Sequence, residues 1–324
     1  MGEMKKISVA RIELTWKNVI VLPCVALMIA TPFIVRSGYV SHIFITALLF
    51  GTLAASFDFG VGYLGIVNFG YAAFMGLGAY TSAIAAIRFG INPWLGLLLG
   101  GVAAGLLGLA TGVLTLRLYG IFVACFTWFL GMALMTLIAI TPEITRGYLG
   151  LSVPFFPNVW ILDFTDPLRL SYFAIIVILS LSILFFIYYL GNRTKMGLAF
   201  RALRGSEPAA MVFGINPLKY RVMNFVITCF IAGTLGSFYG HYIRILTPSL
   251  LATSKTIEIL AIAYLGGRRS LWGSIPAAFL IISVLEFLRP LEAYRFIIYG
   301  IILILIMIFY PGGLARLITR KELF

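Results

Sequence analysis

Few residues of this chain could do chemistry, and the most prominent group is a polar, basic stretch in an otherwise apolar sequence. Between residues 191 and 221 the sequence carries six basic residues against a single acid, Glu207. On both sides the chain is nearly uncharged and long enough to cross a bilayer. A basic loop between two membrane spans is retained in the cytoplasm during insertion. The chemistry that this basic stretch offers is the docking of a soluble partner.

The same stretch predicts a short helix at the membrane surface. Helical residues run roughly over 201–213, and Gly214 follows as a residue that closes a helix cheaply. Asn216 and Pro217 come next and are expected to act as a stop signal. A cytoplasmic helix on a chain without another sizeable polar region is the candidate docking point.

Catalysis, by contrast, is not indicated. The two histidines, His42 and His241, are far apart in the sequence, and no Ser-His-Asp or Cys-His order is present. The three cysteines stand singly in apolar runs, which is typical of small buried residues. The sequence also lacks the G-x-x-x-x-G-K-[ST] loop that cradles ATP phosphates. We therefore expect no enzyme activity, no metal and no cofactor, and any energy from ATP must arrive through a partner.

The composition identifies the setting of these residues as a membrane. Apolar residues make up 61% of the 324 residues and charged residues 11%, against about 25% charged in ordinary soluble domains. The net charge of +13 is explained by basic cytoplasmic loops and by anionic lipid heads, so nucleic acid is not an expected partner.

The apolar segments predict an all-α integral membrane protein with about 8–10 spans, some of them broken or re-entrant. The expected spans are residues 19–35, 40–57, 63–87, 94–116, 119–140, 172–190, 222–243, 257–266, 274–288 and 296–310. The segment 257–266 is too short to cross alone, and glycines interrupt 63–87. The whole chain, 1–324, reads as one transmembrane domain.

The distribution of charge predicts the topology. Of the 24 basic residues, 16 fall in segments assigned to one side of the membrane, which favours both termini and the 191–221 loop in the cytoplasm. The 31-residue segment 141–171 is then external, with four prolines, and is expected to be an ordered loop. It serves either as a connector or as a contact surface for an external partner.

Two glycine-rich stretches interrupt the helical pattern at about membrane depth. They are residues 58–80, with six glycines, and residues 263–273. Such breaks are tolerated where they line a cavity, so they point to a translocation path. Small residues also let helices approach closely, and plain helix packing explains the pattern equally well.

Four stretches, in order along the chain, carry a known pattern. They are GYLG at 62–65 with NFGYAAFMGLGAYT at 68–81, residues 197–216, residues 258–273, and YG at 299–300 through YPGGL at 310–314. Together they resemble the LivH/LivM-type permeases of branched-chain amino acid ABC importers, and they are most similar to the LivM-like half of that family.

This resemblance implies a helical permease subunit in the cell membrane, with a fold like that of the vitamin B12-type importers. It would move branched-chain amino acids or similar small polar solutes into the cell. The implied partners are a second, LivH-like permease subunit, two cytoplasmic ABC ATPases, an extracellular or periplasmic solute-binding protein and membrane lipid. The alternative is a stand-alone secondary transporter or channel, for which only Asp58, Glu258 and Glu286 supply ionisable groups within spans.

The resemblance also assigns candidate residues. The ABC-permease coupling pattern Glu-Ala-Ala-x3-Gly is matched by Ala209, Ala210 and Gly214, with Pro208 at the Glu position and Glu207 displaced by one. The ATPase-coupling set is Arg201, Arg204, Glu207, Ala209, Ala210 and Gly214.

The expected translocation path consists of Asn68, Gly70, Tyr71, Gly76 and Glu258. Where the family usually reads Gly-Gln-x-Ser-x-Gly-His, this chain has Ile66 in place of Gln and Tyr71 in place of His. Glu258 is expected near the outer mouth. There it would meet a ligand's ammonium group, pair with Lys255 or Arg244, or cap a helix.

Overall fold

The computed structural model describes most of the chain from residue 37 to residue 288. The described residues are 37–118, 120–158, 163–164, 166–268, 270–271 and 273–288, with Tyr294, Ile297, Gly300, Ile301 and Ile304. The spans expected at 19–35 and 296–310 therefore lie outside this part of the chain, apart from the few single residues just named.

The protein is an all-α polytopic membrane protein, as the composition predicts. Within the described residues six helices are long and apolar enough to cross a membrane. They are α2 (Gly38–Leu64), α3 (Tyr71–Phe89), α4 (Pro93–Leu114) continued by η1 (Thr115–Arg117), α5 (Ile121–Ile140), α7 (Leu170–Arg193) and α10 (Pro217–Ile243). The spans expected at 40–57, 94–116, 119–140, 172–190 and 222–243 are thus confirmed.

The remaining elements are short. They are α6 (Pro142–Thr145), η2 (Gly147–Leu149), β1 (Leu151–Ser152), α8 (Lys195–Gly205), α9 (Glu207–Val212), β2 (Ile245–Leu246), η3 (Pro248–Leu251), α11 (Thr253–Gly266) and α12 (Ser274–Phe287). Helix α11 has 14 residues and is about 21 Å long, so it cannot cross a hydrocarbon core of about 30 Å. The prediction that segment 257–266 is too short to span is confirmed.

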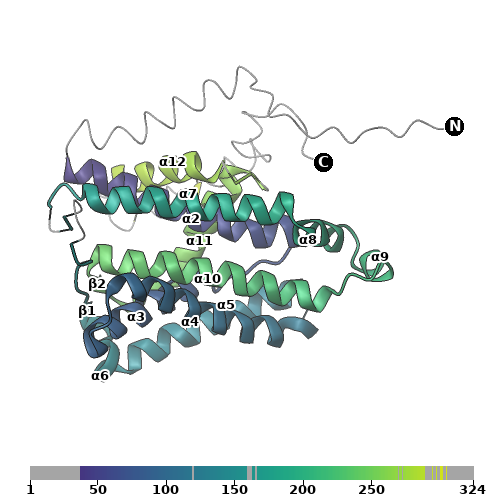
Figure 1. The fold of residues 1–324 in the computed structure, drawn as a ribbon, viewed down its shortest axis with the longest axis horizontal. Coiled ribbons are helices and arrows are strands. Elements are labelled where there is room, and N and C mark those ends of the chain that lie inside the picture. Colours follow the sequence, from purple (N-terminus) through teal and green to yellow (C-terminus); the bar gives the residue numbers. More distant parts are fainter. Residues whose placement is uncertain are drawn as a thin grey trace, which may run out of the picture.

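The long helices lie side by side in a bundle (Figure 1). Helices α8 and α9 lie at one end of the bundle, called here the α8–α9 end. Helix α6 and the antiparallel pair β1–β2 lie at the other, called here the β end. In this arrangement α11 lies inside the bundle, in contact with α2, α12, α3 and α5.

The glycine-rich interruption is shorter than the sequence predicts. Helix α2 continues through Gly60 and Gly62 to Leu64 and ends at Gly65, which has a left-handed backbone with φ of 80°. Helix α3 begins at Tyr71, so the break is confined to residues 65–70. The span expected at 63–87 is accordingly wrong at its start, because Gly65 stops α2 where a residue with a Cβ would be strained.

Helix α9 ends before Asn216 and Pro217, as expected, and these two residues also begin the next helix. The Asn216 side-chain oxygen accepts hydrogen bonds from the backbone N–H groups of Leu218 and Lys219, and Pro217 occupies the first turn of α10. Proline fits there because the first N–H groups of a helix have no intrahelical acceptor. Asn92 begins α4 in the same way, ahead of Pro93.

The single helix expected over 201–213 is also wrong. Two helices, α8 and α9, meet at Ser206, whose backbone is extended and whose hydroxyl accepts a hydrogen bond from the N–H of Ala209. Pro208 lies in the first turn of α9, the position where a helix tolerates it, and it would break a continuous helix. Gly214 follows with φ of 78°, the left-handed conformation expected of it.

Glycines also set the closest helix contacts in the bundle. At the crossing of α3, α4 and α10, a Cβ on Gly78 would collide with the backbone of Gly233, and one on Gly233 would collide with the carbonyl of Gly100. The helices therefore touch backbone to backbone, as small residues permit in membrane proteins.

The described part of the segment 141–171, which was expected to be an ordered external loop, packs against the bundle. Strand β1 pairs with β2, and the rings of Phe156 and Phe164 are each 1% exposed. Phe156 lies 4.8 Å from the ring of Trp94 and 4.9 Å from that of His241, between ring centres. This aromatic cluster ties the segment to α4 and α10 at the β end.

Candidate functional site

The break between α2 and α3 is held by polar side chains that satisfy its backbone. The Asn68 side-chain oxygen accepts a hydrogen bond from the N–H of Gly70 at 3.0 Å. The hydroxyl of Tyr71 donates to the carbonyl of Thr228 on α10 at 3.3 Å. Asn68 is 7% exposed and Tyr71 1% exposed, so both are buried within this chain.

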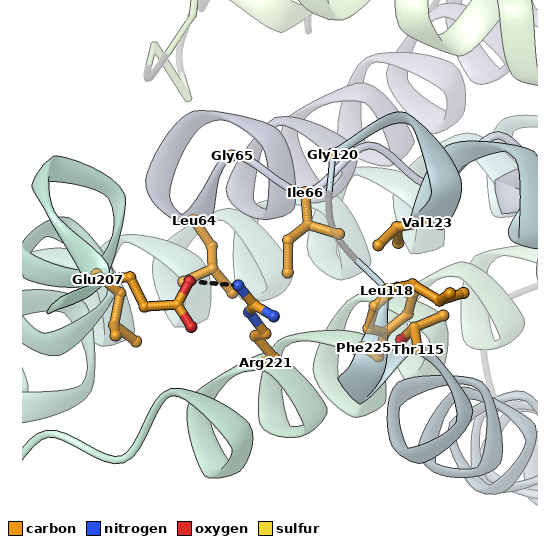
Figure 2. Close-up of a pocket in the computed structure, with 11 residues that line it drawn as sticks. Leu64, Gly65, Ile66, Thr115, Leu118, Gly120, Val123, Glu207, Arg221 and Phe225 are labelled. Carbon is orange, nitrogen blue, oxygen red and sulfur yellow. Dashed lines mark hydrogen bonds and ion pairs between the residues drawn. The ribbon is translucent and has the colours of Figure 1, made fainter. Parts of the chain in front are cut away.

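Asn68 and Tyr71 line a very small cavity. Its volume is about 10 Å³, room for about one water molecule, and its other walls come from α2 and α10. A larger cavity of about 110 Å³ lies between the break and α9, and Ile66 and Phe225 border both cavities. Figure 2 shows this larger cavity with Gly65 and Ile66 on one side and Leu118, Val123 and Phe225 on another.

Two glycines of the expected path are helix contacts. A Cβ on Gly70 would collide with the Thr127 carbonyl of α5, and a Cβ on Gly76 would collide with the Leu251 side chain. Gly76 therefore makes room for η3, and Gly70 makes room for α5. This arrangement is what the helix-packing alternative describes.

Glu258 lies on α11, against the other helices of the bundle. It is the sixth residue of α11 and forms an ion pair with Lys255 in which the Nζ–Oε2 distance is 2.8 Å. Helix α11 starts beside the α2–α3 break, because the Thr256 hydroxyl accepts a hydrogen bond from the N–H of Ala72 at 3.1 Å. The pairing with Lys255, one of the alternatives that the sequence left open, is thus confirmed.

The structure thus brings most of the expected path residues into one region. Asn68, Gly70 and Tyr71 form the break, and α11 with Glu258 begins against the first turn of α3. Gly76 lies further along α3, against η3.

The expected coupling residues lie at the α8–α9 end (Figure 1). Arg201, Ala209 and Gly214 are exposed, Arg204 and Glu207 are half-buried, and Ala210 is 3% exposed. Because Ala210 packs inward, a bulky residue there would displace α9 from the bundle rather than meet a partner directly.

Sequence reasoning did not identify Arg221 as the residue that holds α9 in place. The Arg221 guanidinium of α10 donates a hydrogen bond to Glu207 at 2.5 Å (Figure 2). The Glu207 side chain is 26% exposed and the Arg221 side chain 16%. They are 14 residues apart in sequence, so no helical spacing links them. The pair joins the coupling region to the start of α10 along one side of the larger cavity.

Sequence reasoning also missed an exposed apolar run at this end. Met211, Val212 and Phe213 are 50%, 85% and 84% exposed. The signal was available, because three apolar residues in a row stand in an otherwise polar, basic stretch. A groove of about 480 Å³ adjoins them, lined by Glu207, Met211 and residues 214–218.

The two histidines of the chain have separate hydrogen-bond partners. His241 Nε2 lies 2.9 Å from the Ser82 hydroxyl, and His42 Nδ1 lies 2.6 Å from the hydroxyl of Tyr242. Among the described residues no three His, Cys, Asp or Glu side chains are grouped so that they could hold a metal ion.

Comparison with known proteins gives one family and two named relatives. A family described as "Branched-chain amino acid transport system / permease component" matches residues 39–307. The high-affinity branched-chain amino acid transport system permease protein LivM of Escherichia coli is 29% identical over 317 residues, which cover 92% of this chain and 74% of that protein. The protein of the same name in Salmonella typhimurium is 28% identical over 327 residues, covering 95% of this chain and 76% of its own length. No solved structure matches the chain.

Proposed function

Because this chain belongs to the permease component family of branched-chain amino acid transport systems and is the membrane permease subunit of an ABC importer, we propose that its own cargo is a branched-chain amino acid. It works with a second, LivH-like permease subunit, two cytoplasmic ATPases and an external solute-binding protein. The ATPases hydrolyse ATP, and this subunit converts their movement into opening and closing of a path. Residues 1–324 act as one permease domain.

The proposed orientation puts the α8–α9 end in the cytoplasm. The basic stretch 191–221 lies at this end, and Lys and Arg are retained on the cytoplasmic side. The β end, with residues 141–171, then faces outward and receives the binding protein. Both chain termini are cytoplasmic in this proposal.

The observation that carries the proposed coupling is the exposed apolar tip of α9. Exposed large apolar residues at the polar end of a membrane protein mark a contact surface, and Val212 and Phe213 are more than four-fifths exposed. Arg201 and Ala209 add polar and small contacts, and Gly214 turns the chain back toward α10. The ATPases therefore dock on residues 201–214.

The proposed link from this surface to the path is the Glu207–Arg221 pair. A push on α9 is transmitted through the pair to α10, whose Thr228 carbonyl holds Tyr71. Asn68 and Tyr71 lie at the start of α3 and move with that helix. Binding of the cargo there is weak, since a tight site would trap it.

Reconstituted transport tests this function. The chain is purified with the second permease, the ATPases and the binding protein encoded beside it, and uptake of radiolabelled L-leucine into liposomes is measured. Uptake that requires ATP, both ATPases and the binding protein is expected. Leucine uptake by the chain alone, driven by an ion gradient, would contradict the proposal and favour the stand-alone transporter.

A further inference from the structure

The Lys255–Glu258 ion pair lies near the middle depth of the bundle. Contacts with three helices fix this depth. They are Lys255 Nζ with the ring of Phe50 at 5.3 Å, Thr253 with Trp128 through a 2.9 Å hydrogen bond, and Leu251 with Gly76. Each contact lies 12 or 13 residues from the β end of its helix, or about 18–20 Å along the helix axis. Helices α2 and α5 have 27 and 20 residues, so this level falls well inside the hydrocarbon thickness.

Irregular backbone leads to this pair. From the β end the chain turns inward through β2 and η3, and α11 starts at mid-depth with no helical turn before Thr253 apart from η3. Such backbone is stable in a membrane only where protein buries it or where it lines a water-filled cavity. Leu250 and Leu251 are 7% and 3% exposed, so η3 is buried in protein.

The ion pair itself is not buried in the same way. The Lys255 side chain is 36% exposed and the Glu258 side chain 12%. Charged groups at mid-depth face a bundle interior or a water-filled path and mark functional sites. In a bilayer the exposed side of this pair is expected to face water or another protein surface, because lipid would leave the charges without solvation.

Lys255 lies in the first turn of α11, where the helix dipole favours an anion and disfavours a cation. Its ion pair with Glu258, three residues further on, and its contact with the Phe50 ring offset this cost. Its neighbours Thr253 and Thr256 are engaged with α5 and α3, which holds α11 in place without the ion pair.

We propose that Lys255 and Glu258 are a subsite for the zwitterionic head of an amino acid on the translocation path. Lys255 binds the carboxylate and Glu258 binds the ammonium group as the cargo passes, and the two side chains pair again when it leaves. This inference rests on the proposed transport of amino acids and adds the residues that recognise the backbone of the cargo.

Charge balance explains why such a subsite suits this class of solute. The pair is neutral overall, and so is a zwitterion, so exchanging one ion pair for two leaves no net charge at mid-depth. A solute with an additional positive or negative charge would leave one charge uncompensated, which is costly in a low dielectric. A solute lacking one of the two groups would leave Lys255 or Glu258 without its partner. The subsite therefore favours amino acids with uncharged side chains.

The test measures L-leucine uptake and ATP hydrolysis together in liposomes that hold the whole transporter. In the double variant K255M/E258M both charges are absent. We expect complex assembly and ATP hydrolysis stimulated by the loaded binding protein to stay within about twofold of wild type, while leucine moved per ATP falls about tenfold, the value of one charge-assisted contact. Ile257→Ala, which alters an exposed apolar residue of the same helix, is the matched control and should transport normally.

A pair that only fastens α11 gives a different result. Replacing a whole ion pair with apolar side chains is often neutral for stability, so unchanged uptake by K255M/E258M would overturn the subsite. The single variants K255M and E258Q leave one unpaired charge and are expected to transport less than wild type. If wild type itself moves no leucine with its ATPases and binding protein, the proposed function fails first, and that outcome is distinct.

A second measurement does not depend on assembly of the double variant. Glu258→Cys is introduced into the transporter after its native cysteines are removed. A small water-soluble thiol reagent is expected to modify this cysteine, and leucine-loaded binding protein with ATP is expected to slow the modification. A cysteine that is never modified would show that the position faces lipid or packed protein and would overturn the proposal.

Discussion

Removing the apolar tip of α9 should weaken ATPase docking strongly. The perturbation is the double variant V212S/F213S, which changes two side chains that are 85% and 84% exposed. Full burial of one such side chain is worth about 1.5–3 kcal/mol, so the pair contributes about 3–6 kcal/mol when wholly covered. At half coverage the loss is about 1.5–3 kcal/mol, which raises the Kd about 10- to 140-fold.

The assay is binding of the purified ATPase to the permease pair in nanodiscs, followed by its stimulated ATP hydrolysis. The single variant Phe213→Leu should keep most of the wild-type affinity, because leucine retains apolar area at this position. Leu149→Ser is the control, since Leu149 is 90% exposed in η2 at the β end and its replacement removes exposed apolar area away from α9. Equal ATPase affinity for V212S/F213S and wild type would refute docking on α9. An equal loss of affinity for Leu149→Ser would refute the localisation of docking to the α8–α9 end.

Three further predictions follow from the packing and the charge distribution. Gly78→Ala should lower the free energy of unfolding by about 1–3 kcal/mol, because the added methyl group meets Gly233. Gly205→Ala has open space around the added methyl group and should raise the free energy of unfolding by about 0.5–1 kcal/mol. Chemical denaturation in detergent measures both variants, and equal effects would contradict the backbone contact of Gly78. A cysteine at Ser206 should react with an impermeant reagent from the cytoplasmic side only, and labelling from outside intact cells would reverse the topology. Gly70→Leu should reduce the maximal uptake rate more than the apparent affinity, because it pushes α5 away from the break, and unchanged uptake would show that the break tolerates movement of α5.

Apolar length and charge in the sequence were sufficient for the overall architecture. Runs of about 20 uncharged residues must be helices in a bilayer, since backbone groups have no water to bond there. That argument located five spans directly and marked segment 257–266 as too short. Four stretches in order along the chain were together also sufficient for the family. The left-handed backbone of Gly214 was also predicted correctly, because this conformation depends on the glycine itself.

Boundaries set by competing local signals were not predictable. Ser206 and Pro208 divide a segment that the sequence predicts as one helix. The serine cap stabilises a new helix start, and a proline inside a continuous helix would break its hydrogen bonds. Asn216 and Pro217 serve equally well to end one helix or begin the next, and only the path of the chain decides between them.

Tertiary structure alone decided which distant residues meet. Whether a glycine lines a path or packs a helix depends on the element opposite it, and the sequence does not show that Thr127 faces Gly70 or that Leu251 faces Gly76. The pairing of Glu207 with Arg221 has the same character. The neighbours of Lys255 and Glu258 also came from tertiary structure, because only the fold brings α11 against α2, α3 and α5.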